Sequence, residues 1–305
     1  MEAREEGGMD RWQPGGNTGV VWEDKYTKDP DGGWVWGNHS EATPAQLQAM
    51  QNMVKANKHC FAYSMAELGG HEHPVSIGRF RGQPAYVRPK QYSLVEEAVV
   101  QKHCVELRDA GLIKPVPLTN LFAARPTIAA KKDAETGEWT ATRFCVNYIR
   151  QNQGTDTIPH ALPLPEAIFR KFGKARYFSK IDMRSGFHQL VLDEESQQRT
   201  AFWWGNELWC YTRLPFGLKN SSAVYQRVMD TVLAEARLTD FASAFIDDVI
   251  IWSETAEEHV ERVQQVLQAL VGAGLKAHPD KSIFMAEGVE YLGHVVSPCG
   301  LSPHA

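Results

Sequence analysis

The chain has 305 residues, of which 43% are hydrophobic, so it is long enough to bury one large core or two modest ones. Its formal net charge of −5 and pI of about 6.1 exclude the overall basic composition that is typical of many nucleic-acid-binding proteins. The charge is uneven. Residues 1–50 hold nine acidic and four basic side chains, whereas residues 125–220 hold fourteen basic and ten acidic ones and are mildly basic.

The cysteines and the start of the chain indicate its cellular environment. The five cysteines are odd in number and widely spaced, without a Cys-x-x-Cys pair or a Cys/His cluster, which predicts free thiols and no zinc site. The charged residues 1–6 lack the apolar segment of a signal peptide, and no run approaches the ~18 apolar residues that a membrane span needs. We therefore expect a soluble intracellular protein, in the cytoplasm or the nucleus, without a membrane partner.

The N-terminal part has few regular patterns. Residues 1–40 are rich in Gly, Asp and Glu and lack periodicity, so we expect a mobile leader, although its four tryptophans could dock on a surface. Residues 41–90 form a flanking segment that begins with a predicted helix, for which Thr43 is the N-cap. His71 and His73 supply only two metal ligands, which is too few for a zinc site.

The rest of the chain alternates helical and extended patterns. A capping box from Ser93 to Glu96 predicts a helix that ends near Ala110. From residue 176 onward, the order of the elements fits one sheet covered by two helices. The predicted elements are a hairpin of 127–133 and 140–148, a strand at 176–182, a hairpin of 200–204 and 207–213, a helix from Asn220 or Ser221 (either of which can cap it) to about 236, a hairpin within 241–253, a helix at 256–271 and a strand at 289–296.

Two adjacent carboxylates, Asp247 and Asp248, interrupt the apolar run 241–253. The β-branched and aromatic flanks predict two short strands with the acids in a tight turn, and a turn of solvated acids explains the pair when it is taken alone. Asp182 ends the predicted strand at 176–182. If these strands share one sheet, the three carboxylates meet at its edge, where their repulsion would call for hard cations such as Mg²⁺.

Ordered motifs add a resemblance to a known family. They are Asp182-Met-Arg-Ser-Gly-Phe-His-Gln189, Leu214-Pro-Phe-Gly-Leu218, Tyr225-Gln226, Phe245-Ile-Asp-Asp248 and Tyr291-Leu-Gly-His294. In this order they resemble the reverse transcriptase of gypsy-type long-terminal-repeat retrotransposons, and more distantly that of retroviruses. The resemblance implies an α+β right-hand polymerase fold, with fingers and palm in residues 91–300 and a ferredoxin-like antiparallel palm sheet backed by helices.

The resemblance also implies an activity, that of an RNA-directed DNA polymerase, which is a nucleotidyltransferase. Asp182, Asp247 and Asp248 match the family's catalytic carboxylates, which hold two Mg²⁺ or Mn²⁺ ions. Such ions stabilise the attacking and leaving oxygens in phosphoryl transfer. The implied partners are an RNA template, a DNA primer, dNTPs and other parts of a retroelement polyprotein.

Further residues match the family's substrate-binding positions. Lys131 or Lys132 and Arg143 match the fingers hairpin over the triphosphate, although a solvated basic hairpin explains them too. Phe187 matches the aromatic gate that leaves no room for a 2′-hydroxyl, and an ordinary core phenylalanine is the alternative. The remaining matches are Phe216 beside the templating pair, Lys281 near the leaving pyrophosphate, and Leu292, Gly293 and His294 in the primer grip.

Two departures from the family pattern favour a second function. The family usually has Val-Asp-Tyr-Arg, whereas this chain has Val-Asn-Tyr-Ile at 146–149, which alters a fingers contact or an ion pair. The sequence reaches only Ala305, before the family's thumb and ribonuclease H regions, so we expect weakened duplex binding. The alternative function is a catalytically weak or inactive retroelement remnant that binds RNA/DNA duplex. Phe187 disfavours a third option, an RNA-templated RNA polymerase.

Overall fold

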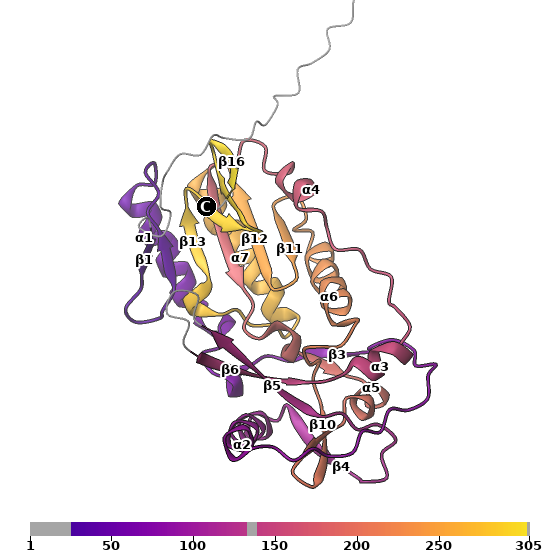
Figure 1. The fold of residues 1–305 in the computed structure, drawn as a ribbon. Helices are drawn as coiled ribbons and strands as arrows, with labels where there is room; N and C mark the ends of the chain where they lie inside the picture. Colours follow the sequence, from indigo (N-terminus) through magenta and orange to yellow (C-terminus); the bar gives the residue numbers. More distant parts are fainter. Residues whose placement is uncertain (1–25, 133–138, 304–305) are drawn as a thin grey trace, which may run out of the picture.

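The computed structural model describes residues 26–132 and 139–303 (Figure 1). Its largest unit is a six-stranded sheet with the strand order β1-β2-β13-β7-β12-β11. Neighbouring strands are antiparallel except β13, which runs parallel to β2. The strands of this main sheet are β1 (Tyr26–Lys28), β2 (Val35–Gly37), β7 (Tyr177–Asp182), β11 (Ala242–Phe245), β12 (Asp248–Ser253) and β13 (Ile283–Ala286).

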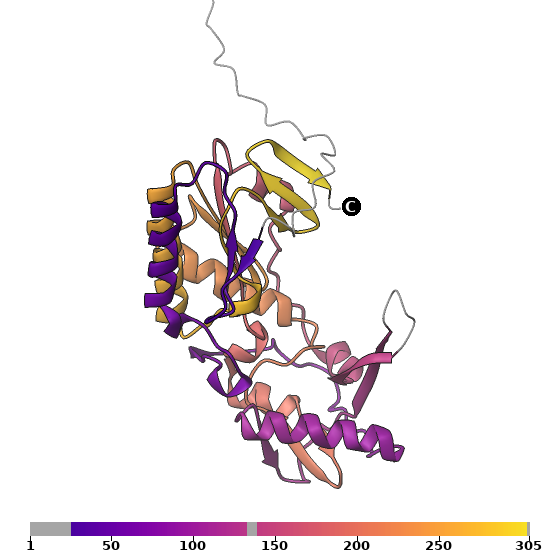
Figure 2. The same ribbon diagram turned by 90° about the vertical axis from the view of Figure 1, so that its left-hand side faces the viewer.

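Two helices cover one face of the main sheet in a ferredoxin-like arrangement. Along the chain, β7, α6 (Ser221–Glu235), β11, β12, α7 (Ala256–Gly272) and β13 follow one another, with an insertion after β7. Helix α7 packs on β7 and β12, and α6 packs on β11. Helix α1 (Pro44–Ala56) lies against α7, as Figure 2 shows. The predicted α+β class, with an antiparallel sheet backed by helices, is confirmed.

Strand β12 is buried on both faces of the sheet. Val249 and Ile251 belong to the core beneath α6 and α7, whereas Ile250 and Trp252 belong to a second cluster on the opposite face. That cluster includes residues of α4 (Pro165–Phe169). A strand covered on both faces appears in sequence as a continuous apolar run, without the alternation of a half-exposed strand.

A second, smaller part lies below the main sheet in Figure 1. It contains a three-stranded sheet of order β4-β10-β9, the β5–β6 hairpin and α2, whose capping box at Ser93 forms as predicted. Strands β3 (His71–Val75) and β8 (Leu190–Leu192) pair in parallel. The elements of the smaller part are α2 (Leu94–Asp109), β4 (Ile113–Val116), β5 (Pro126–Lys132), β6 (Trp139–Val146), α3 (Ile149–Gly154), α5 (Glu194–Arg199), β9 (Phe202–Trp204) and β10 (Glu207–Tyr211).

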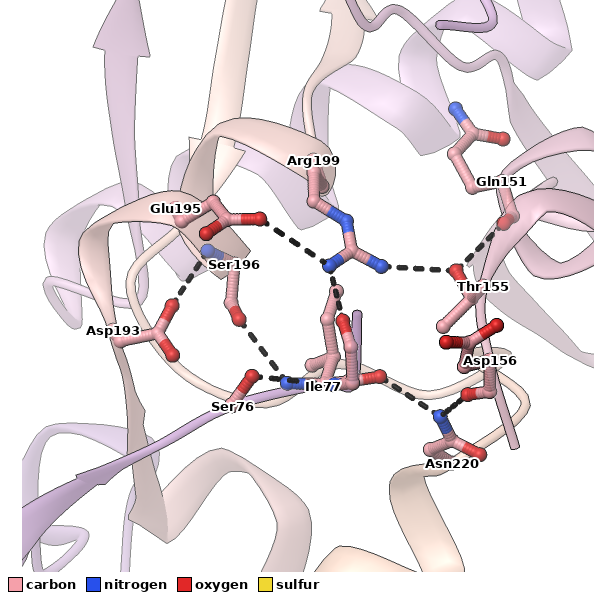
Figure 3. Close-up of polar contacts among 11 residues, drawn as sticks. Ser76, Ile77, Gln151, Thr155, Asp156, Asp193, Glu195, Ser196, Arg199 and Asn220 are labelled. Atoms are coloured by element: carbon pink, nitrogen blue, oxygen red, sulfur yellow. Dashed lines mark hydrogen bonds and ion pairs between the residues drawn. The ribbon is translucent and has the colours of Figure 1, made fainter. Parts of the chain in front are cut away.

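A buried polar network joins the smaller part to the start of α6 (Figure 3). The Arg199 guanidinium, in a residue only 3% exposed, donates to the Gly78 carbonyl and, at 2.9 Å, to the Thr155 hydroxyl. The Asn220 amide donates to the Asp156 carbonyl at 2.8 Å. Asn220 occupies the N-cap position of α6, as predicted, but its side chain binds in this network and makes no capping hydrogen bond. Leaving one of these buried groups unpaired would cost about 1–3 kcal/mol.

Residues 26–40 are folded, so the expectation of a mobile leader is wrong for this range. Strands β1 and β2 extend the main sheet, and Trp34 and Trp36 are only 4% and 7% exposed. Gly37 allows β2 to approach β13 closely, because a Cβ at this position would lie 2.3 Å from the Ala286 Cα. Short strands separated by Gly and Asp have no detectable period, which is why the sequence pattern missed them. Residues 1–25 lie outside the described residues.

The predicted single strand at 289–296 is instead a hairpin. Strands β14 (Val289–Tyr291) and β15 (His294–Ser297) are joined by Leu292 and Gly293, whose φ angles are 53° and 74°. Positive φ at both loop positions is typical of a type I′ turn. A leucine is unusual at such a position, so the sequence carried only half of the normal turn signal. A third strand, β16 (Gly300–Pro303), pairs with β15.

The structure also shows the state of the cysteines and whether a described helix could cross a membrane. All five cysteines are free, as predicted. No helix in the described part of the chain is both long enough and apolar enough to cross a membrane.

We predict that Trp36→Ala lowers the free energy of unfolding by about 3–4 kcal/mol, because it removes a large buried ring from β2 of the main sheet. Urea unfolding followed by circular dichroism measures this loss. The matched control is Trp209→Ala, at a partly exposed ring on β10. A loss for Trp36→Ala that is no larger than the control's would show that β2 does not belong to the folded core.

Candidate active site

Strands β7 and β12 bring three carboxylates to one end of the main sheet. Asp182, the last residue of β7, is the ladder partner of Asp248, the first residue of β12. Asp247 precedes β12, and its carbonyl accepts a hydrogen bond of 2.8 Å from the Met183 amide. Directly opposed residues in an antiparallel pair have Cβ atoms about 4.5–5.5 Å apart, so like charges there repel each other. The expected meeting of the three acids at one sheet edge is present.

A strained two-residue turn carries Asp247. Ile246 and Asp247 connect β11 to β12, and Ile246 has a φ of 53°. A β-branched residue in this left-handed region costs about 1–3 kcal/mol, so the surroundings must hold it there. The buried Gln226 side chain of α6 does so. Its Oε1 accepts from the Ile246 amide at 2.7 Å, and its Nε2 donates to the Ala244 carbonyl at 2.9 Å.

Asp247 lies directly against Gly186, which begins the short 3-10 helix η4 (Gly186–Gln189). A Cβ at Gly186 would lie 2.3 Å from Asp247 Oδ1 and 2.6 Å from the Tyr225 hydroxyl. Any side chain at 186 would therefore displace the carboxylate or the tyrosine. The sequence motif contained Gly186, but only the packed structure shows that its lack of a Cβ makes room for Asp247.

The site has more negative than positive charge. Burial raises the pKa of Asp247 to about 7, the charges of Asp182 and Asp248 raise it as well, and Lys281 lowers it. Burial also raises the pKa of Asp182, although Lys281 Nζ lies 3.8 Å from Asp182 Oδ1 and opposes the shift. Lys180 Nζ lies 3.7 Å from Asp248 Oδ1. Two lysines at these distances do not fully compensate three closely spaced acids.

The donor atoms fit a hard divalent cation. Asp247 Oδ1 and Asp248 Oδ1 are buried and have no hydrogen-bond partner within the described residues. Carboxylate oxygens are the ligands that Mg²⁺ and Mn²⁺ prefer. Across 26–132 and 139–303, no group of three or more His, Cys, Asp or Glu side chains is already arranged to hold a metal ion. Mg²⁺ does not need such a cage, because it keeps waters and substrate phosphates among its ligands.

An aromatic cluster borders the carboxylates. Phe187 is 8% exposed, and its ring centroid lies 5.4 Å from that of Tyr225 and 5.1 Å from that of Phe216. Phe216 is 49% exposed, so the cluster extends from beside Asp247 to the surface. The predicted gate residue therefore adjoins the carboxylates, and it also packs in the main core, as its alternative explanation required.

Comparison with known proteins identifies the family. A family model described as reverse transcriptase (RNA-dependent DNA polymerase) matches residues 140–296, which is more than half of the chain. The chain belongs to the reverse transcriptase family. The Pol polyproteins of transposons 297 and gypsy, both from Drosophila melanogaster, are 35% and 31% identical to it over 219 and 228 residues. These alignments cover 70% and 74% of this chain but only 20% and 22% of the relatives, so the chain spans about a fifth of their length. The predicted gypsy-type resemblance is confirmed.

Solved structures of foamy viral protease-reverse transcriptase share the fold. The complex of that protein with ds DNA has a TM-score of 0.75 and 21% identity, covering 87% of this chain and 45% of that chain. Its complex with an RNA/DNA hybrid also has a TM-score of 0.75, with 20% identity over 87% of this chain and 35% of that one. At this identity the similarity supports the fold alone. We call the main sheet with its helices the palm and the smaller part the fingers, after the predicted polymerase fold.

The fingers hairpin β5–β6 carries the three predicted basic residues of this reverse transcriptase domain. In the ladder, Arg143 pairs with Ala129, and Lys131 pairs with Ala141. The side chains of Lys131, Lys132 and Arg143 lie outside the described part of the structure, as does the turn at 133–138. Their contact with a nucleotide triphosphate stays a prediction.

The unusual Asn147 of this reverse transcriptase domain has a local structural role. Its Oδ1 accepts from the Ile149 amide at 3.1 Å, where α3 begins. In α3, Asn152 donates to the Gly217 carbonyl at 2.9 Å and accepts from the Lys219 amide at 2.8 Å. Both the substituted segment and the loop that carries Phe216 are therefore tied to α3. The sequence did not predict this hydrogen bond from the first residue of α3 to Asn147.

The predicted primer-grip residues lie in the β14–β15 hairpin. Leu292 and Gly293 form its turn, and the His294 ring centroid lies 5.3 Å from that of Phe169. The Tyr291 hydroxyl donates to the Asp248 carbonyl at 3.4 Å. This long hydrogen bond joins the hairpin to the strand that carries the carboxylates, but contact with a primer stays a prediction.

We predict that Asp247→Asn stabilises the cation-free protein at pH 8. The folded-state pKa of about 7 lies above the ordinary value for aspartate, so the folded protein holds a proton that the unfolded chain loses. The contribution of Asp247 to the free energy of unfolding of the wild type therefore falls as the pH rises from about 4 to about 7. An asparagine at this position has no charge, so its contribution does not change with pH. The melting temperature in EDTA should rise by about 3 °C at pH 8.

The same measurement at pH 4 should show only a small gain, because Asp247 is then protonated in the folded protein and about half protonated in the unfolded chain. The control is Asp156→Asn, whose carboxylate is 40% exposed in an ion pair with Arg81. A gain for Asp247→Asn that is independent of pH would contradict the prediction.

Proposed function

We propose that this chain is the polymerase core of a reverse transcriptase and that it extends a DNA primer on an RNA template. The observation that carries the proposal is the meeting of Asp182, Asp247 and Asp248 at one sheet edge in a chain of this family. Foamy viral protease-reverse transcriptase, which has the same fold, was solved in complex with ds DNA and with an RNA/DNA hybrid. These complexes support nucleic-acid partners for this chain.

The three carboxylates are the groups that would hold Mg²⁺ or Mn²⁺, with Asp182 and Asp247 as the main ligands and Asp248 as the secondary one. When bound, such ions stabilise the attacking and leaving oxygens of phosphoryl transfer. The chain itself supplies the geometry. The Gln226 hydrogen bond and the space beside Gly186 keep Asp247 at the edge of the sheet. Asp247 Oδ1 is buried, so the charge of this carboxylate is less screened by water and interacts more strongly with a cation.

The remaining substrate contacts are assigned from the positions of the residues in the family motifs and in the fold. Lys281 is placed beside Asp182, so its ammonium is suited to the leaving pyrophosphate. Phe187 would lie under the sugar of the incoming dNTP. The residues proposed for the other contacts are Phe216 for the templating pair, Lys131, Lys132 and Arg143 for the triphosphate, and Leu292, Gly293 and His294 for the primer terminus.

We predict that Asp247→Asn lowers the rate of primer extension by at least about 10³-fold, because it removes one ligand charge from the reacting phosphate site. Single-nucleotide incorporation on an RNA template with a DNA primer and Mg²⁺ measures the rate. Affinity for the duplex, measured in parallel, should change little.

Wild-type protein that extends no faster than this variant would defeat the polymerase proposal. If both proteins still bound the duplex with an affinity that falls with salt, the result would favour the second function, an inactive retroelement remnant that binds RNA/DNA duplex.

We predict that Phe187→Val increases incorporation of ribonucleotides relative to deoxynucleotides by about 10-fold or more, because a smaller side chain leaves room for the 2′-hydroxyl. The ratio of kcat/KM for a matched NTP and dNTP measures this selectivity. Phe187→Tyr is the control, since it retains the ring and should retain the preference. If all three proteins show the same ratio, Phe187 is a core residue only.

A further inference from the structure

A continuous series of hydrogen bonds leads from the protein surface to the turn that carries Asp247. His160 Nε2 lies 2.8 Å from Asp230 Oδ2. Asp230 Oδ1 accepts from Gln226 Nε2 at 2.8 Å, and Gln226 Oε1 accepts from the Ile246 amide at 2.7 Å. The site described above uses only the last of these contacts, so His160 and Asp230 have no assigned role.

The orientation of the Gln226 amide decides whether the turn is held. The two ends of an amide have nearly the same shape, but only the oxygen accepts a hydrogen bond. Gln226 is fully buried, so water cannot substitute for a missing partner. Its Nε2 faces two acceptors, the Ala244 carbonyl and Asp230 Oδ1. A flipped amide would turn its NH₂ group toward the Ile246 N–H and its oxygen toward both acceptors, which is unfavourable on every side.

His160 in turn restricts Asp230. The Asp230 carboxylate is 46% exposed on the surface of α6, where it would otherwise rotate freely into water. The His160 side chain is 24% exposed and holds the second carboxylate oxygen. An imidazole donates from Nε2 both as the matching neutral tautomer and when protonated, so the contact does not depend on the charge of the histidine.

The position of His160 in the chain connects the two parts of the fold. It lies between α3 of the fingers and α4 of the palm, four residues after Asp156, whose carbonyl accepts from Asn220. The amide of Ile158 also donates to Asn220 Oδ1, at 3.1 Å. The connecting segment is therefore anchored to α6 at three places. The first two are at Asn220, and the third is at Asp230, about three turns further along the helix and one turn after Gln226.

We infer that His160 and Asp230 are positioning residues for the polymerase reaction. They hold the Gln226 amide in the one orientation that supports the Ile246 turn, and thereby keep Asp247 in place. The inference rests on the proposed function and extends it to residues outside the carboxylate site.

Single-turnover and steady-state kinetics of primer extension test the role. Asp230→Leu should lower kcat by about 10-fold, and His160→Ala by a smaller factor, with little change in KM for the primer-template, because displacement of Asp247 affects the reaction more than binding. Asp230→Asn should restore kcat to near wild type, since its side-chain oxygen still accepts from Gln226. The matched control is Asp156→Ala, which removes the Arg81–Asp156 ion pair of 2.6 Å from the same segment.

Hydrogen exchange of the Ile246 amide provides a readout that needs no activity. Exchange should be faster than in wild type for Asp230→Leu and His160→Ala, and unchanged for Asp230→Asn and Asp156→Ala. His160→Ala alters a partly exposed side chain, so it keeps the test valid if Asp230→Leu does not fold.

The outcomes separate the two proposals. If wild type extends the primer but kcat and Ile246 exchange are the same in both disrupting variants, the positioning role is overturned and the polymerase function stands. If wild type does not extend the primer, the proposed function fails. In that case, faster Ile246 exchange in the variants would still support the positioning of the turn, and unchanged exchange would overturn it.

Discussion

The pairing of Asp182 with Asp248 across β7 and β12 is the constraint on which the rest of the structure depends. Two carboxylates opposite each other in a ladder, with a third beside them, oppose folding. The strands pair in this register because β12 is buried on both faces, and burial of apolar surface contributes roughly 25 cal/mol per Å². Hydrophobic packing thus holds in place an electrostatic arrangement that is unfavourable in the absence of cations.

Several features near the carboxylates are locally unfavourable, and each has a partner elsewhere in the fold. Ile246 adopts a left-handed conformation and is held by Gln226 of α6. The Arg199 and Asn220 network fixes the start of that helix relative to the fingers (Figure 3). Strain of this kind persists only where surrounding contacts determine the conformation, and it is common at functional sites. Contacts from both the fingers and the palm therefore fix α6, whose Gln226 holds the turn that carries Asp247.

The sequence was informative where the controlling interactions are local. The N-cap at Thr43 and the capping box at Ser93 formed as predicted, because each joins residues three positions apart. Predictions failed where distant contacts took over. The Asn220 side chain binds segments far away in sequence and leaves its own helix without a side-chain cap, and Trp36 belongs to a strand that pairs with the distant strand β13. Leu292 adopts a turn conformation that its residue type disfavours.

The sequence by itself determined the chemistry that is available: the three acids, their order among the family motifs, and the apolar run that became β12. The tertiary structure decided how these residues are placed and what surrounds them. The register of β7 and β12, the pKa of Asp247 near 7, the space beside Gly186 and the contact between His160 and Asp230 all depend on residues far apart in the chain. Local patterns report neighbours within a turn or a strand, whereas desolvation, steric fit and ladder register arise only when distant segments pack together.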